Sequence, residues 1–166
     1  MDGFYSSSSS DFYILSYEEL KFIEAEAAWL NGNTARAYSA YEDAVRTNML
    51  RMGIDATAID SYLSSNSLAA ANAEADLTLE KIMFQKYLTM PFHPEVWVDM
   101  RRYDYSDQVY PGFEQPANAD ASLNGEFIRR IDMFDAEIQY NVDETTRIGA
   151  LELDYRAQPV WWDIQN

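Results

Sequence analysis

A chain of 166 residues in which 48% are hydrophobic and 14% aromatic can bury one sizeable core, so the chain should fold rather than stay disordered. Its 28 acidic and 12 basic residues give a formal net charge of −16, which repels the phosphate backbone and argues against a nucleic-acid partner. There is no cysteine, so disulfides, thiolate metal sites and cysteine nucleophiles are excluded, and no stretch has the roughly 20 apolar residues of a membrane span.

The first predicted elements form a helical hairpin. Ser16 and Glu19 form a capping box that starts a helix, and Gly32 supplies the left-handed residue that ends it. Asn33 can cap a second helix that runs to Gly53, so two antiparallel helices meet across a very short turn. Each helix has a face marked by helical spacing: Leu20, Ile23, Ala27 and Leu30 on the first, and Ala37, Tyr41, Ala44 and Asn48 on the second.

The second helix also matches part of a repeat pattern. Ala37, Tyr41 and Ala44 follow the small, aromatic, small order of the second helix of tetratricopeptide repeats, where small residues let neighbouring helices approach closely. The first-helix signature of that repeat is only partly present. This pattern alone therefore supports a tetratricopeptide-like hairpin and a generic helical hairpin equally.

Three more helices are expected before residue 103. A short helix covers Ala56–Leu63, and a stronger one, capped by Thr78, runs to Met90. Pro91 stops that helix, and Pro94 suits the first turn of the next. Helical patterning therefore dominates the chain up to this point.

The remaining third of the chain is less regular. Residues 104–124, with two prolines and a glycine, read as a long irregular segment of the kind that serves function or docking, or as an ordinary surface loop. Residues 125–141 are ambiguous between a short strand and a helix. The closing residues 160–163 are too aromatic for a free tail and should pack onto the helices. We therefore expect one domain over 1–166, with a flexible lead-in at 1–13, helices at 14–102, and loops and short elements at 103–166.

The residues that catalysis needs are scarce. His93 is the only histidine and sits at a predicted helix start, so a capping or packed role is favoured over catalysis. Carboxylate pairs occur, but with so many acids they arise by chance and read as solvated faces. No phosphate-binding or dinucleotide-binding loop is present. We therefore predict no catalytic residue, no metal site and no cofactor.

Aromatic residues are the most abundant candidates for ligand contact. The chain has 12 Tyr, 8 Phe and 4 Trp, and flat rings are the usual platforms for the apolar faces of sugars. Most of these rings should simply form the core. The candidates lie in the irregular segment, because loops sit at the surface: Tyr103, Tyr105, Tyr110 and Phe113.

Several motifs, taken in order, resemble the SusD/RagB family, in its SusD-like branch. Residues 14–27 are similar to the family's "sYaElkFIeAEA" entry helix, and residues 79–102 to its "I..QKy…eaW.d.RR" segment. Residues 129–141 are similar to its "R-R-[IL]-pYP..E…N" run, although Phe134 and Asp135 stand where the family commonly has Tyr-Pro, which puts the expected turn in doubt. The motif residues are Glu26, Trp97, Arg101, Arg102, Arg130, Glu137, Asn141, Trp161 and Trp162.

The resemblance implies an all-α, tetratricopeptide-like fold and a non-catalytic accessory protein that binds a nutrient, usually a glycan. It further implies a SusC-like TonB-dependent transporter as partner and a lipid anchor on the cell-surface side of the outer membrane. The absence of a signal peptide and anchor cysteine fits the C-terminal portion of such a protein. For Arg101 and Arg102, a packing and ion-pair role is favoured over ligand contact.

Two other functions stay open at this point. A tetratricopeptide-like scaffold for a protein partner would use the same helical hairpin. A glycan-active enzyme would need two carboxylates in a pocket at the separations typical of glycosidases.

Overall fold

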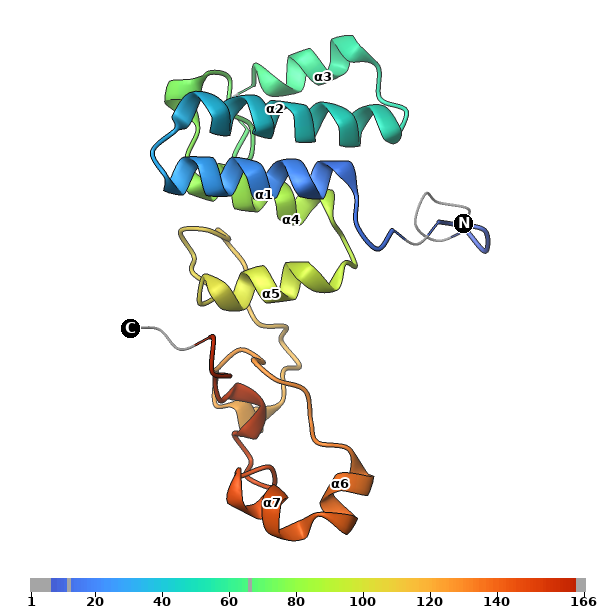
Figure 1. Cartoon of the computed structure of the whole chain (residues 1–166), viewed down its shortest axis with the longest axis vertical. Coiled ribbons are helices and arrows are strands. Elements are labelled where there is room, and N and C mark those ends of the chain that lie inside the picture. Colours follow the sequence, from blue (N-terminus) through green and yellow to red (C-terminus); the bar gives the residue numbers. More distant parts are fainter. Residues whose placement is uncertain (1–6, 12, 66, 164–166) are drawn as a thin grey trace. The chain divides into compact units, whose positions relative to one another are not determined.

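A computed structural model describes residues 7–11, 13–65 and 67–163, and the sequence-based lead-in at 1–13 lies partly outside them. Within the described residues the fold is all-α, as predicted, with no β-strand (Figure 1). The helices are α1 Tyr17–Leu30, α2 Thr34–Arg51, α3 Ala56–Leu63, α4 Leu79–Thr89, α5 Pro94–Arg102, α6 Asp135–Tyr140 and α7 Val142–Arg147.

The chain divides into two compact units. The first, unit 1, comprises residues 1–97 and 108–110, and the second, unit 2, comprises residues 98–107 and 111–166. Unit 1 holds α1 to α4, and unit 2 holds α6 and α7. That residues 1–166 form one domain, in which the two units unfold together, stays a prediction.

The predicted caps of unit 1 are confirmed. The Glu19 amide donates to Ser16 Oγ at 3.2 Å, and the Ser16 amide donates to the Glu19 carboxylate at 3.4 Å, which completes the capping box of α1. Gly32 has φ +75°, and the Asn33 side chain accepts the Arg36 amide at 3.2 Å to begin α2. These local interactions satisfy backbone donors that helix ends leave without partners.

Unit 1 is built on the α1/α2 hairpin, with α4 against α1 and α3 against α2 (Figure 1). The predicted face of α2 is buried as expected, including Ala37, Tyr41 and Ala44, each 0% exposed. Phe22 of α1 meets Tyr41 edge-on, with ring centroids 6.4 Å apart. Ile82 and Met83 of α4 complete this apolar core.

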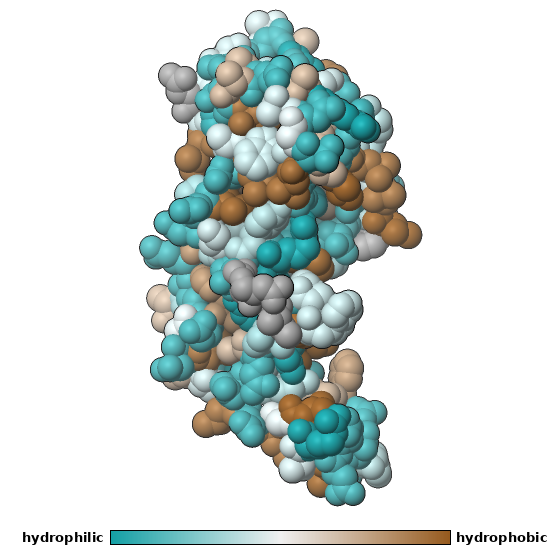
Figure 2. Space-filling view, turned by 60° about the vertical axis from the view of Figure 1, so that its left-hand side comes forward, coloured by the Kyte–Doolittle hydropathy of each residue, from teal (hydrophilic) through white to brown (hydrophobic). Residues whose placement is uncertain are grey.

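The face of α1 that the sequence pattern marked is exposed. Leu20, Ile23 and Leu30 are 50%, 45% and 61% exposed, whereas the buried face carries Phe22 and Ala25. The pattern correctly predicts a helix but not the side that packs. Figure 2 shows a band of hydrophobic surface at the height that α1 and α4 have in Figure 1.

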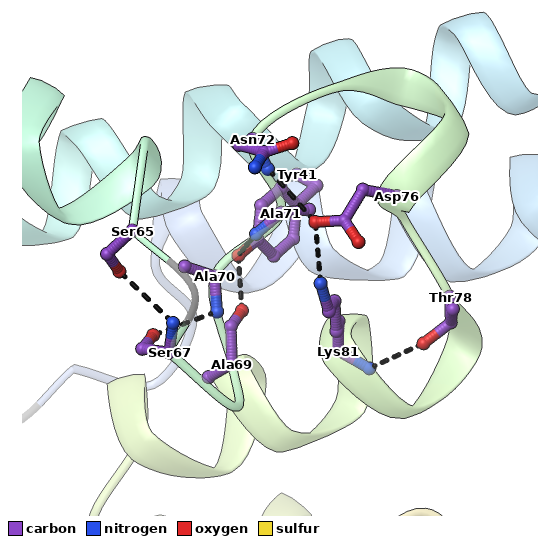
Figure 3. A network of polar contacts seen from close by, with 10 residues as sticks. All are labelled: Tyr41, Ser65, Ser67, Ala69, Ala70, Ala71, Asn72, Asp76, Thr78 and Lys81. Atoms are coloured by element: carbon purple, nitrogen blue, oxygen red, sulfur yellow. Dashed lines mark hydrogen bonds and ion pairs between the residues drawn. The ribbon is translucent and has the colours of Figure 1, made fainter.

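The segment between α3 and α4 is fixed by Tyr41 (Figure 3). Its hydroxyl donates to the carbonyl oxygen of Ala69 at 2.5 Å and accepts the Ala71 amide at 3.3 Å. Nearby, Asp76 accepts the Lys81 ammonium at 2.6 Å and the Asn72 amide at 3.3 Å. The Tyr41 hydroxyl thus satisfies two backbone groups of residues 69–71, which lie outside any helix, and each such bond contributes about 0.5–1.5 kcal/mol.

Unit 2 has a smaller core. Tyr105 is stacked on Phe127, with centroids 4.4 Å apart, and on Phe113 at 6.2 Å. Around these rings, Arg129 pairs with Asp163 at 2.7 Å and also with Asp104. The predicted irregular segment 104–124 is confirmed, with one short 3-10 helix at Ala121–Leu123.

Two expectations for unit 2 are resolved. The ambiguous stretch 125–141 contains helix α6, which Asp135 opens directly after Phe134. At the end of the chain, Trp162 lies under the Arg101 guanidinium, 4.6 Å from the ring centroid. The prediction that all these aromatics pack was wrong for Trp161, which is 84% exposed. Trp162 and Asp163 already make the contacts that hold this end.

Candidate functional site

A cavity of about 210 Å³ opens in unit 1 where three separate segments meet. The start of α1 and the lead-in before it form one side, the end of α2 a second, and the turn after α4 a third. This volume is below the about 300–1,000 Å³ of pockets that enclose drug-sized ligands, so the cavity has room for only one small unit of a ligand. The lining residues are Asp11, Tyr13, Ser16, Glu18, Glu19, Arg51, Thr89, Met90, Pro91, Phe92 and His93.

Phe92 stands at the cavity in an unusual state. Its backbone has φ +68°, a left-handed conformation that costs a non-glycine residue about 1–3 kcal/mol. Its side chain is 92% exposed, although phenylalanine is among the residues most often buried. The turn that imposes this conformation is closed by the His93 amide, which donates to the Met90 carbonyl at 3.2 Å. An exposed ring on a strained backbone beside a cavity is typical of a binding surface rather than of a core.

A second ring lines the same cavity. Tyr13 is 37% exposed, and the Arg51 guanidinium lies 4.5 Å from its ring centroid. Arg51 also pairs with Glu18, whose side chain is only 3% exposed. The Arg51 guanidinium, which the Glu18 carboxylate holds in place, in turn positions the Tyr13 ring. The cavity therefore carries two exposed rings and one ion pair whose carboxylate is buried.

The polar wall of the cavity is held in place by local bonds. Glu19 is committed to the capping box of α1, and Glu18 is committed to Arg51. His93 Nδ1 accepts the Glu95 amide at 3.3 Å, so Nε2 is the ring nitrogen that can donate. The sequence-based prediction of a capping role for His93 is confirmed. This arrangement offers hydrogen bonds and stacking surfaces, which are the means of ligand binding.

The four aromatics predicted from sequence lie elsewhere. Tyr105 is 8% exposed within its ring stack, where its hydroxyl donates to the Ile128 carbonyl. Phe113 belongs to that stack. Tyr110 is 2% exposed and meets Tyr87 edge-on at 6.2 Å. Tyr103 is half-buried, with the Arg102 guanidinium 5.1 Å from its ring centroid. Their role in ligand contact stays a prediction.

The motif arginines make structural contacts. Arg101 donates to the Arg129 carbonyl at 2.8 Å, and Arg102 pairs with Asp99 at 2.7 Å. Arg130 donates to the Gln158 carbonyl at 2.8 Å and also to the Pro159 carbonyl. These guanidinium groups bind carbonyl oxygens or acids within unit 2, as the favoured packing role requires.

The other motif residues are spread over the fold. Glu26 is 5% exposed on the buried face of α1, and Trp97 is half-buried in α5. Asn141 donates to the Glu137 carboxylate at 3.3 Å at the end of α6. These residues belong to α1, α5 and α6. Of these helices, only α1 contributes residues to the unit 1 cavity, namely Glu18 and Glu19.

Sequence reasoning missed Tyr13, Arg51 and Phe92 as site residues. The available signal was the run Pro91-Phe92-His93-Pro94, which places an aromatic residue between two helix-breaking prolines. Tyr13 and Arg51 carry no local signal, because only the tertiary fold brings them to this turn.

The sequence model of one protein family matches residues 4–133, and that family is described as starch-binding and associating with the outer membrane. This chain belongs to the SusD-like family. No curated protein and no solved structure matches it. The family description is that of a binding protein. Among the described residues, no helix has the length and apolar character that crossing a membrane requires.

Proposed function

We propose that this SusD-like chain binds a glycan in the unit 1 cavity, without cleaving it, and presents it to a SusC-like TonB-dependent transporter at the outer membrane. The single observation that carries the binding site is Phe92, whose exposed ring stands at the cavity on a strained backbone. The family description, starch-binding and outer-membrane association, supports the glycan and the location.

The cavity chemistry suits a sugar ring. A pyranose has an apolar face of C–H groups and a rim of hydroxyls, so it needs a flat apolar platform with donors and acceptors at the edge. Phe92 and Tyr13 supply platforms. Arg51 and the His93 Nε2–H group supply donors at the same cavity, and the exposed Asp11 supplies an acceptor. Stacking on an exposed ring contributes roughly 1–2 kcal/mol from buried apolar area.

The transporter and the lipid anchor are the more specific parts of the proposal. They rest on the family's association with the outer membrane. A tagged parent protein that carries this chain should co-purify from detergent-solubilised outer membranes with a TonB-dependent transporter. Recovery of the parent protein in the periplasmic fraction, without a transporter, would contradict this part.

Binding is tested by calorimetric titration with linear starch oligosaccharides of increasing length. Phe92→Ala should weaken binding about tenfold or more, because about 1.4 kcal/mol corresponds to a factor of ten. Phe134→Ala is the matched control, since Phe134 is also an exposed phenylalanine, at 71%, and does not line the cavity. Equal affinities for the two variants would contradict the placement of the site. Release of reducing sugar ends over time would contradict the non-catalytic role.

The exposed stripe on α1 favours a second candidate, a tetratricopeptide-like scaffold for a protein partner. Leu20, Ile23 and Ala27 line a groove of about 480 Å³ beside Arg36. Exposed apolar stripes of this kind are typical of helix-binding surfaces. If this is the main function, Ile23→Glu should abolish partner capture while starch oligosaccharides fail to bind the unsubstituted chain.

A further inference from the structure

The unit 1 cavity lies at one end of three helices that pack against one another. The first turn of α1, the last turn of α2 and the turn after α4 supply its walls, and these helix ends lie at the same end of unit 1 (Figure 1). Each of α1, α2 and α4 packs on the other two. The interior between them is filled by Phe22, Tyr41 and Ile82, each 0% exposed. The cavity therefore has no opening toward the core.

The cavity lining divides into a buried floor and an exposed rim. Four lining residues are at most 6% exposed and form the floor: Glu18, Glu19, Thr89 and Met90. The Glu18–Arg51 ion pair joins the wall from α1 to the wall from α2. Tyr13 and Phe92 form the rim, where Phe92 is almost fully exposed. The cavity is thus closed at its inner end and opens outward past the two rings.

A closed inner end decides which part of a glycan fits. An interior residue of starch is linked to a neighbour on two opposite sides of its ring, so both neighbours need a way out of the cavity. A terminal residue is linked on one side only, and a single opening is sufficient for it. The volume of about 210 Å³ has room for only one small unit, so a chain cannot enter, turn inside the cavity and leave again.

Building on the glycan binding proposed for this cavity, we propose that it recognises the end of a glycan chain. The terminal sugar enters the cavity, and its neighbour lies at the opening on the exposed Phe92 ring. The next residues of the chain extend into solvent and contribute little to affinity. At equal mass, short oligosaccharides offer many more ends than a long polysaccharide, so the site selects released fragments over the intact polymer.

The first test compares a linear chain with a ring by calorimetric titration of the full chain. Maltohexaose and α-cyclodextrin contain the same number of glucose units, but the ring has no end. Maltohexaose should bind about tenfold or more tightly than α-cyclodextrin, and maltotriose should match maltohexaose within about twofold. Equal affinity for maltohexaose and α-cyclodextrin would overturn the recognition of a chain end and leave glycan binding intact. Failure of both to bind would contradict the proposed function itself.

The second test asks which of the two chain ends enters. One modified maltohexaose has its reducing end opened by borohydride, and another carries a 4,6-O-ethylidene group on its non-reducing end. The form altered at the end that enters the cavity should bind about tenfold more weakly than unmodified maltohexaose, and the other form should bind as before. Full affinity for both modified forms would rule out an end in the cavity.

A variant then places the second sugar on Phe92. In the unsubstituted chain, maltose should bind about tenfold more tightly than methyl α-glucoside, because only maltose has a second residue to stack on the ring. Phe92→Ala should reduce this ratio to about twofold or less. Phe134→Ala, which alters an exposed ring outside the cavity, should leave the ratio unchanged. An undiminished ratio in Phe92→Ala would overturn this arrangement of the chain end.

Discussion

Each of the two units is stabilised internally by a different kind of interaction. Unit 1 buries large apolar side chains between paired helices, with Phe22, Val45, Ile59 and Ile82 at most 1% exposed. Unit 2 has fewer buried apolar residues and relies on arginines that bind carboxylates and carbonyl oxygens, with Arg129 and Asp163 at its centre. Apolar burial is nearly independent of salt and pH, whereas ion pairs are not. The stability of unit 1 should therefore depend on side-chain volume, and that of unit 2 on charge.

This difference also bears on the candidate site. The unit 1 cavity offers two rings on segments that flank the helices, Tyr13 before α1 and Phe92 after α4. Variants that each destabilise one of the two units test this comparison.

The largest expected effect is the loss of a buried ring in unit 1. Phe22→Ala removes a 0% exposed side chain that meets Tyr41 edge-on, and it should lower the free energy of unfolding by about 3–5 kcal/mol. Hydrogen exchange by mass spectrometry should show faster exchange in α1, α2 and α4. Leu20→Ala on the exposed side of α1 is the control and should change stability by less than about 0.5 kcal/mol.

Arg129→Met should have the second largest effect, and it should act in unit 2. It keeps the apolar stem but leaves the buried Asp163 carboxylate without its cation, a change that costs about 3 kcal/mol. Hydrogen exchange in residues 120–163 should rise, while exchange in α1 and α2 stays the same. The double variant Arg129→Met/Asp163→Leu should recover part of the loss, and no recovery would argue against the ion pair as the cause.

The smallest effect concerns pH. In unit 2 the Ser122 amide, and then the Arg156 guanidinium, lower the pKa of the Asp120 carboxyl to about 2. Because the folded pKa lies below the unfolded value of about 3.9, the carboxylate stabilises the fold above pH 4, and this contribution is lost as the pH falls toward 2. Denaturant titrations of the unsubstituted chain and of Asp120→Asn should differ at pH 6 and converge near pH 2.

Sequence reasoning predicted the parts of the fold that depend on local chemistry. The capping residues Ser16, Asn33 and Thr78 place helix starts correctly, because a cap bonds to amides only two or three residues away. The buried side of α1 was not predictable in the same way. Leu20 and Ile23 have the right spacing for a core face, but only the position of neighbouring helices decides which side packs.

The candidate site depended on contacts that are distant in sequence. Tyr13, Arg51 and Phe92 meet only after the α1/α2 hairpin and α4 have packed, so no single motif contains them. Tyr105 looked like a surface loop aromatic, yet unit 2 has little helix in which to place a core, and its loop rings fill that role. The irregular segment was therefore identified correctly, while most of its aromatic rings turned out to be buried.

The most direct measurement of the central claim is a two-dimensional NMR titration that resolves individual aromatic rings. With starch oligosaccharides added, the ring signals of Phe92 and Tyr13 should shift, because these exposed rings line the unit 1 cavity, while those of the buried Tyr105 stack stay in place. Shifts confined to Tyr103, Tyr105, Tyr110 and Phe113, with Phe92 unmoved, would contradict this account and return the site to the irregular segment.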